Sequence, residues 1–141
     1  MLDDFQNILT SFAALLCGFS VGGTWIGVVV VPNESFDHMD HTRADRNVRE
    51  TLVAASTPIA IMLLAASVLA VLGGALGAGI VAAVSAFGYF TNRWTLAPRK
   101  PRSAPPGARQ RKKTQRVVAV ALSLIFGLGS IAAGVMAALQ I

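Results

Sequence analysis

The side chains best suited to chemistry gather in one short stretch, VVVVPNESFDHMDHTRADR, residues 28–46. It holds the only histidines of the chain, His38 and His41, each directly after an aspartate. On one continuous helix, Glu34, His38, His41 and Asp45 would recur at helical spacing and share a face. Two imidazoles with carboxylates and open positions form a ligand set known from non-haem iron proteins. These four residues are therefore the candidate metal or catalytic site.

Local turn signals give the same stretch a second interpretation. Thr42 and Asp45 match a capping box, which would begin the second helix at Arg43 and leave both histidines outside it. Pro32-Asn33 is typical of a turn that leaves the preceding helix. This interpretation separates the four candidate ligands.

Charge pairing in the stretch also favours a solvated ionic loop. Asp45 with Arg49, and Arg46 with Glu50, stand four residues apart with opposite charge, as on an exposed helix surface. We favour this interpretation over a metal site, assign no catalytic residue, and predict no cofactor.

The elements around this stretch must be membrane helices. Of the 141 residues, 54% are hydrophobic and 13% are charged, about half the charged share of a soluble domain. Residues 5–31, 51–92 and 117–141 contain no Asp, Glu, Lys, Arg or His. Apolar runs longer than about 18 residues are typical of bilayer-spanning helices.

The run 51–92 is about twice as long as one span needs, so we expect it to fold back at Gly73-Gly74. We predict an all-α, integral membrane four-helix bundle in a single domain, 1–141. The expected spans are 5–31, 51–72, 76–93 and 117–139, and the expected loops are 32–50 and 94–116.

The basic residues predict the orientation of these spans. All 12 Lys and Arg residues fall in or beside the two expected loops, which share one side of the membrane. Positive loops stay in the cytoplasm, so both long loops are predicted to be cytoplasmic and both termini outside, N-out and C-out. Trp25, Tyr89 and Trp94 lie where an interfacial aromatic belt is expected.

Small residues recur at four-residue spacing along the expected spans. Helices in lipid associate through close packing, which small residues on one face permit. The pattern predicts a tight bundle, with a face left for self-association. The residues concerned are Gly18, Gly22, Gly23, Gly27, Gly73, Gly77, Ser130 and Gly134.

Hydroxyl side chains are the main polar groups inside the expected spans. We expect them to form hydrogen bonds between helices rather than a conduction path. Transporters coupled to protons or ions usually keep an ionisable residue within a span, so transport by this chain alone is disfavoured. The hydroxyl residues concerned are Thr10, Ser11, Ser20, Thr24, Ser67, Ser85 and Ser123.

The second loop is rich in proline and cations and, over 98–116, has no acid. Such a segment buries too little apolar area to fold, so it is expected to be disordered or extended. Its cations are a topology signal and would attract anionic lipid by about 1 kcal/mol each, or bind an acidic protein partner. Nucleic acid is a weaker alternative, because no aromatic residues are interleaved to stack bases. The residues predicted to bind lipid or partner are Arg99, Lys100, Arg102, Arg109, Arg111, Lys112, Lys113 and Arg116.

A glycine-rich first span ends in a proline in GFSVGGTWIGVVVVP, residues 18–32, and Asn92 follows the third span in TNRWTL. This layout resembles the small four-helix membrane proteins grouped with anthrone oxygenases. The proline-rich turn usual before that Asn is replaced here by AFGYF. The resemblance covers the layout of the whole chain but few identical residues. It implies a four-helix membrane fold and assigns oxygenase activity to no residue here.

The expected function is that of a non-catalytic accessory, assembly or scaffold component of a larger membrane complex. We expect a multi-pass protein of a prokaryotic cell (inner) membrane, in contact with anionic lipid and with other membrane subunits or copies of itself. Two alternatives stay open. One is a small membrane oxidoreductase or metal-binding protein that uses His38 and His41, and the other is a channel or transporter subunit formed by oligomerisation.

Overall fold

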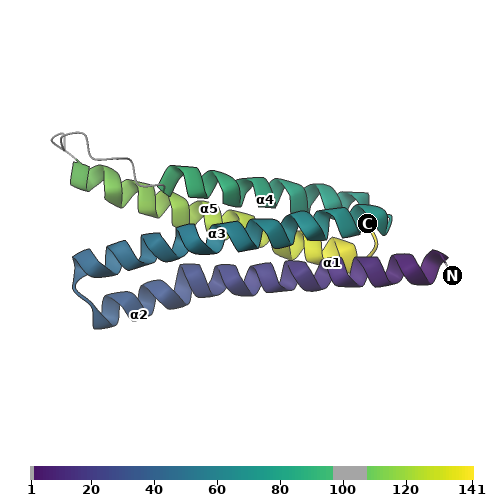
Figure 1. Ribbon diagram of the computed structural model, residues 1–141, viewed down its shortest axis with the longest axis horizontal. Helices are drawn as coiled ribbons and strands as arrows, with labels where there is room; N and C mark the ends of the chain where they lie inside the picture. The colour runs from purple at the N-terminus through teal and green to yellow at the C-terminus, as the bar shows by residue number, and fades with distance from the viewer. Residues whose placement is uncertain (1, 97–107) are drawn as a thin grey trace.

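The chain forms an elongated all-α four-helix bundle (Figure 1). The computed structural model describes residues 2–96 and 108–141, without the side chains of residues 95 and 108–113. The elements are α1 (Leu2–Trp25), the π-helix η1 (Ile26–Val30), α2 (Val31–His38), α3 (His41–Leu72), α4 (Leu76–Leu96) and α5 (Ala108–Ala138). Because α1, η1 and α2 form one continuous helix, they supply the first of the four rods.

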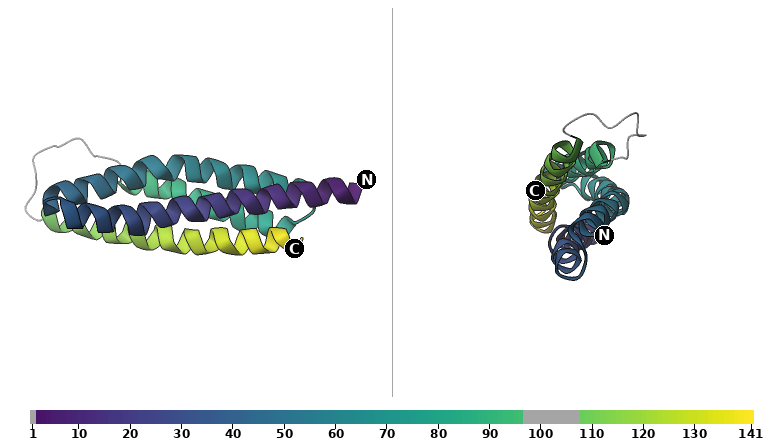
Figure 2. Two further views of the ribbon diagram at one scale, coloured as in Figure 1. Left: turned by 90° about the horizontal axis from the view of Figure 1, so that it is seen from below. Right: turned by 90° about the vertical axis from the view of Figure 1, so that its left-hand side faces the viewer.

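The four rods lie side by side in a ring, in which α1 packs against α3 and α5, and α4 packs against the same two helices. Figure 2 shows both chain ends at one end of the bundle and the turn between α2 and α3 at the other. We call these the terminal end and the loop end. The alternating helix directions also put the last residues of α4 and the first residues of α5 at the loop end.

Gly73 and Gly74 form the turn at the terminal end. Helix α3 ends at Leu72, and α4 begins at Leu76. Gly74 has φ of +86°, a conformation that residues with a Cβ resist. The turn predicted from the paired glycines is therefore confirmed.

The first helix continues further than the sequence predicted. Leu2–His38 is a single helix of 37 residues, about 55 Å long at 1.5 Å per residue. The expected turn at Pro32-Asn33 is wrong, because Pro32 lies in the first turn of α2. In the preceding π-helix, the Val31 N–H bonds to the Ile26 carbonyl, five residues back. This wider turn accommodates a proline that has no N–H and would clash with the carbonyl four residues before it.

The expected loop 32–50 is mostly helical. Helix α2 ends at His38, Met39 is extended, and α3 begins at His41 with Asp40 at its N-cap. The capping box predicted at Thr42 is therefore wrong, because Thr42 lies inside α3 and the N-cap residue makes no side-chain hydrogen bond. The second expected loop is also shorter than predicted, since α5 begins at Ala108. The prediction of a disordered or extended segment is wrong for residues 108–116.

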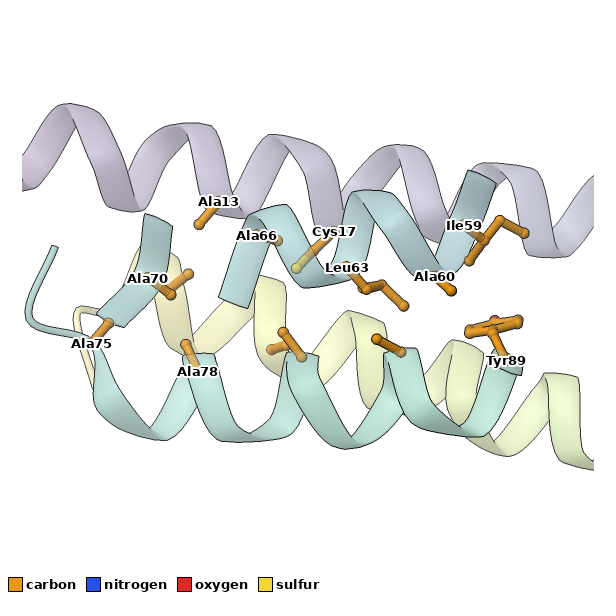
Figure 3. Packing of buried hydrophobic residues seen from close by; sticks show 14 residues of the cluster. Ala13, Cys17, Ile59, Ala60, Leu63, Ala66, Ala70, Ala75, Ala78 and Tyr89 are labelled. Atoms are coloured by element: carbon orange, nitrogen blue, oxygen red, sulfur yellow. The ribbon is translucent and has the colours of Figure 1, made fainter. Parts of the chain in front are cut away.

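Three helices in the described part of the chain are long and apolar enough to cross a membrane: Leu2–His38, His41–Leu72 and Thr114–Ala138. Small side chains fill much of the space between the four rods of the bundle, as Figure 3 shows for Ala13, Ala66 and Ala78. A buried alanine lets two helix backbones approach closely, which is how helices associate in lipid. Larger side chains such as Phe12, Phe19 and Phe87 point outward, with 56–69% of their surface exposed.

Candidate functional site

The four candidate metal ligands do not share one face. Met39 interrupts the helix between His38 and His41, so Glu34 and His38 lie on α2 while His41 and Asp45 lie on α3. His38 Nδ1 lies 3.6 Å from a Glu34 carboxylate oxygen, and the His41 ring packs against Phe36 with the centroids 5.7 Å apart. Among the described residues, no group of three His, Cys, Asp or Glu side chains is placed to hold a metal ion.

Asp45 instead joins α3 to α5. Its Oδ1 accepts a hydrogen bond of 2.5 Å from Arg116 Nη1, in place of the predicted pairing with Arg49. The Arg116 guanidinium also lies over the Phe36 ring, 5.1 Å from the centroid, a distance suited to a cation–π contact. The predicted pair of Arg46 and Glu50 is present, at 2.7 Å. One residue from each of α2, α3 and α5 therefore meets at the loop end.

Arg116 is the one residue of the predicted lipid- or partner-binding set whose side chain is described. It is committed to Asp45 and is only 22% exposed, so it is poorly placed to meet lipid. Arg99, Lys100 and Arg102 lie outside the described residues, as do the side chains of Arg109, Arg111, Lys112 and Lys113.

The predicted packing glycines fall into two groups. A Cβ on Gly73 would lie 2.6 Å from Thr10, on Gly77 2.7 Å from Met136, and on Gly134 3.2 Å from Cys17. Gly23 and Gly27 have looser neighbours, at 3.5 Å from Ile59 and 4.0 Å from Leu52. Ser130 is fully buried and bonds to the Phe126 carbonyl of its own helix.

Gly18 and Gly22 form the second group. A Cβ at either position would have nothing within 4 Å, and both residues are exposed on α1. In the part of the chain that the structure describes, this predicted packing motif therefore meets no other helix.

Hydroxyl groups link the helices less often than predicted. Ser20 and Ser85 donate to carbonyls four residues back in their own helices, and Thr10 and Ser11 do the same near the N-terminus. Of the seven predicted residues, Ser67, Thr24 and Ser123 form a hydrogen bond to another helix in the described part of the chain. A hydroxyl inside a helix finds a carbonyl of the preceding turn within reach, which explains the difference.

The most concentrated group of polar contacts between helices surrounds Tyr89 and Asn92 on α4. Tyr89 OH lies 2.5 Å from Thr24 Oγ1 of α1 and 3.3 Å from the Ser123 carbonyl of α5. Asn92 Nδ2 donates to Ser123 Oγ at 2.7 Å and to the Ala119 carbonyl at 3.1 Å. Both side chains are buried, so the expectation that Tyr89 belongs to an aromatic belt is wrong. Trp25 and Trp94 are exposed, as an interfacial position requires.

A small cavity that is partly open to the outside of the bundle lies beside this polar group and the π-helix. Its volume is about 10 Å³, close to the least space that one water molecule needs. Its wall combines four polar side chains with small and branched apolar residues. The lining residues are Gly23, Thr24, Gly27, Val28, Leu52, Ala55, Ser56, Ile59, Tyr89 and Ser123. In Figure 3, Tyr89 faces Ile59 and Ala60 across the interior of the bundle.

Comparison with known protein families, curated proteins and solved structures finds no match to this chain. The functional argument therefore rests on the fold and on the open face of α1 around Gly18 and Gly22. The sequence analysis did not predict the polar group around Tyr89, because a tyrosine near the end of an apolar run fits an interfacial position equally well. The available signal was the spacing of Tyr89 and Asn92, which puts both on one helix face.

Proposed function

We propose that the protein is a four-span membrane protein that serves as a non-catalytic accessory or assembly component of a larger membrane complex. The observation that carries this proposal is the open face of α1 around Gly18 and Gly22. Other predicted packing glycines, such as Gly73, Gly77 and Gly134, already meet side chains of this chain. A close-packing motif without an internal partner is suited to a helix of another subunit.

The surroundings of these two glycines support the same proposal. Phe12, Leu15, Phe19 and Ile26 are 52–61% exposed, and with Gly22 they recur every three or four residues along α1 and into η1. Large side chains beside a glycine gap make a shape into which a second helix can pack. The face is about 20 Å long, since it covers four turns of helix.

The position of α4 supports the fourth span. Helix α4 packs lengthwise against both α3 and α5 (Figure 1), so it would occupy the same depth in the bilayer as those two helices. Its 21 residues extend about 30 Å, which matches the hydrocarbon thickness. We place the loop end in the cytoplasm, because basic residues of α3, α4 and α5 lie toward it. The described ones are Arg43, Arg46, Arg49, Arg93 and Arg116.

Copurification from mild detergent tests the proposed function. We expect wild-type protein to migrate as a complex whose other subunits mass spectrometry identifies reproducibly. Gly22→Ile fills the gap on α1 and should release those subunits. Ala65→Ile is the matched control, because Ala65 is an exposed small residue on α3, and it should retain them. A lone monomer under several mild conditions, or equal retention by both variants, contradicts the proposal.

A further inference from the structure

Two hydroxyl groups in the wall of the cavity beside η1, those of Thr24 and Tyr89, make more contacts than they have hydrogens. Thr24 Oγ1 lies 2.7 Å from the Ser20 carbonyl and 2.5 Å from Tyr89 OH, which in turn lies 3.3 Å from the Ser123 carbonyl. Each hydroxyl carries one hydrogen. Two hydrogens therefore serve three contacts, and one of the contacts always lacks a donor.

Two further acceptors belong to the same wall. Ser56 donates its hydrogen to the Leu52 carbonyl at 2.6 Å, so its oxygen faces other groups only as an acceptor. The Gly27 carbonyl loses its ordinary α-helical donor, because the Val31 N–H bonds to Ile26 instead. The next amide along the chain belongs to Pro32, which has no N–H. Unsatisfied backbone groups inside a membrane protein are costly, and ordered water often pairs them.

We propose that this cavity binds one water molecule, which donates its two hydrogens to acceptors of this wall. The cavity has room for a single water of this size. A neutral guest is favoured over a cation, because the lining residues include no ionised side chain to balance a charge. The bound water would supply the hydrogens that the π-helix and Pro32 remove, and so hold the long first helix together where it passes the proline.

Filling the cavity with a methyl group tests the proposal, because a dry cavity and a water-filled cavity predict opposite changes in the unfolding midpoint. A Cβ on Gly27 would meet only Leu52, at 4.0 Å, so Gly27→Ala fits without a clash. In a dry cavity the added methyl group would improve packing and helix propensity, and the unfolding midpoint would rise. If the methyl group displaces a bound water, the acceptors lose their donor and the midpoint falls below that of Gly18→Ala, the open-face control on the same helix.

A second pair of variants covers the case in which Gly27→Ala does not fold. Ser56 and Ser130 are both buried, and each donates to the carbonyl four residues back. Only Ser56 lines the cavity. Ser56→Ala should therefore lower the unfolding midpoint more than Ser130→Ala does. Equal losses for the two serine variants overturn the proposal.

A high-resolution experimental structure of the full chain then identifies the guest. We expect one density peak at hydrogen-bonding distance from at least two wall oxygens in the wild type, and its loss in Gly27→Ala. An unfolding midpoint that rises with Na⁺ or K⁺ but not with choline would assign the peak to a cation and overturn the proposal. A cavity without density, combined with a stabilised Gly27→Ala, would overturn it as well.

Discussion

Gly88 on α4 is a position where one added methyl group should disturb close packing between two helices. An added Cβ there would lie 2.2 Å from Cε2 and Cζ of Phe126 on α5, far inside van der Waals contact. The Phe126 ring also packs beside Tyr89, with the ring centroids 6.2 Å apart. Gly88→Ala therefore forces the ring, or the whole seam between α4 and α5, to move.

The size of the effect follows from comparing Gly88→Ala with Gly18→Ala. Replacing glycine by alanine inside a helix gains about 1 kcal/mol of helix propensity at either site. Overpacking a filled contact costs about 1–3 kcal/mol, and only Gly88 has such a contact, since Gly18 has open space around it. The free energy of unfolding of Gly88→Ala should thus be lower than that of Gly18→Ala by about 1–3 kcal/mol.

Reversible unfolding in mixed micelles, followed by circular dichroism, measures both free energies. Phe126→Leu provides a double-mutant cycle, because the smaller side chain relieves the contact and should recover most of the loss in the Gly88→Ala background. Equal stability of the two alanine variants, or a loss that Phe126→Leu leaves unchanged, would refute close packing between Gly88 and Phe126.

Further changes test other contacts between helices. Asn92→Leu removes two hydrogen bonds from α4 to α5 and should lower the unfolding free energy by about 1–3 kcal/mol, while the control Thr91→Val, whose hydroxyl bonds within its own helix, should change it little. Arg116→Gln should increase hydrogen exchange of the α2 amides, because Arg116 contacts both Asp45 and Phe36; unchanged exchange would show that the loop end holds without it. In a Cys17→Ser background, Met39→Cys should react with membrane-impermeant maleimide only after the cytoplasmic side of the membrane is opened to the reagent. Reaction in intact cells would show that the proposed orientation is reversed.

The positions of the four candidate metal ligands depend on structure that their spacing in the sequence does not predict. Glu34, His38, His41 and Asp45 have the spacing of a ligand set, but one extended residue, Met39, ends the shared helix face. The partner of Asp45 is Arg116, which lies 71 residues further along the chain. No local pattern predicts a contact between residues so far apart, because helix pairing rules extend only three or four positions.

Other differences have the same origin. Pro32 favours the end of a helix by its own chemistry, yet a π-turn before it and packing of α2 against α3 keep the first helix continuous. Tyr89 suits a membrane interface by residue type, but Thr24 and Ser123 give its hydroxyl partners inside the bundle. In both cases tertiary contacts override a local preference that is worth only a few kcal/mol.

The helical class and the fold-back at Gly73-Gly74 could be predicted from the amino-acid sequence, because they depend on hydropathy and glycine content that are local to each segment. Which glycines pack inside the bundle and which face outward became known only from the packing of the helices. Gly18 and Gly73 are the same residue type in similar motifs, yet one has open space and the other meets Thr10 at 2.6 Å. The rotation of each helix about its axis determines that difference, and it depends on all four helices packing together.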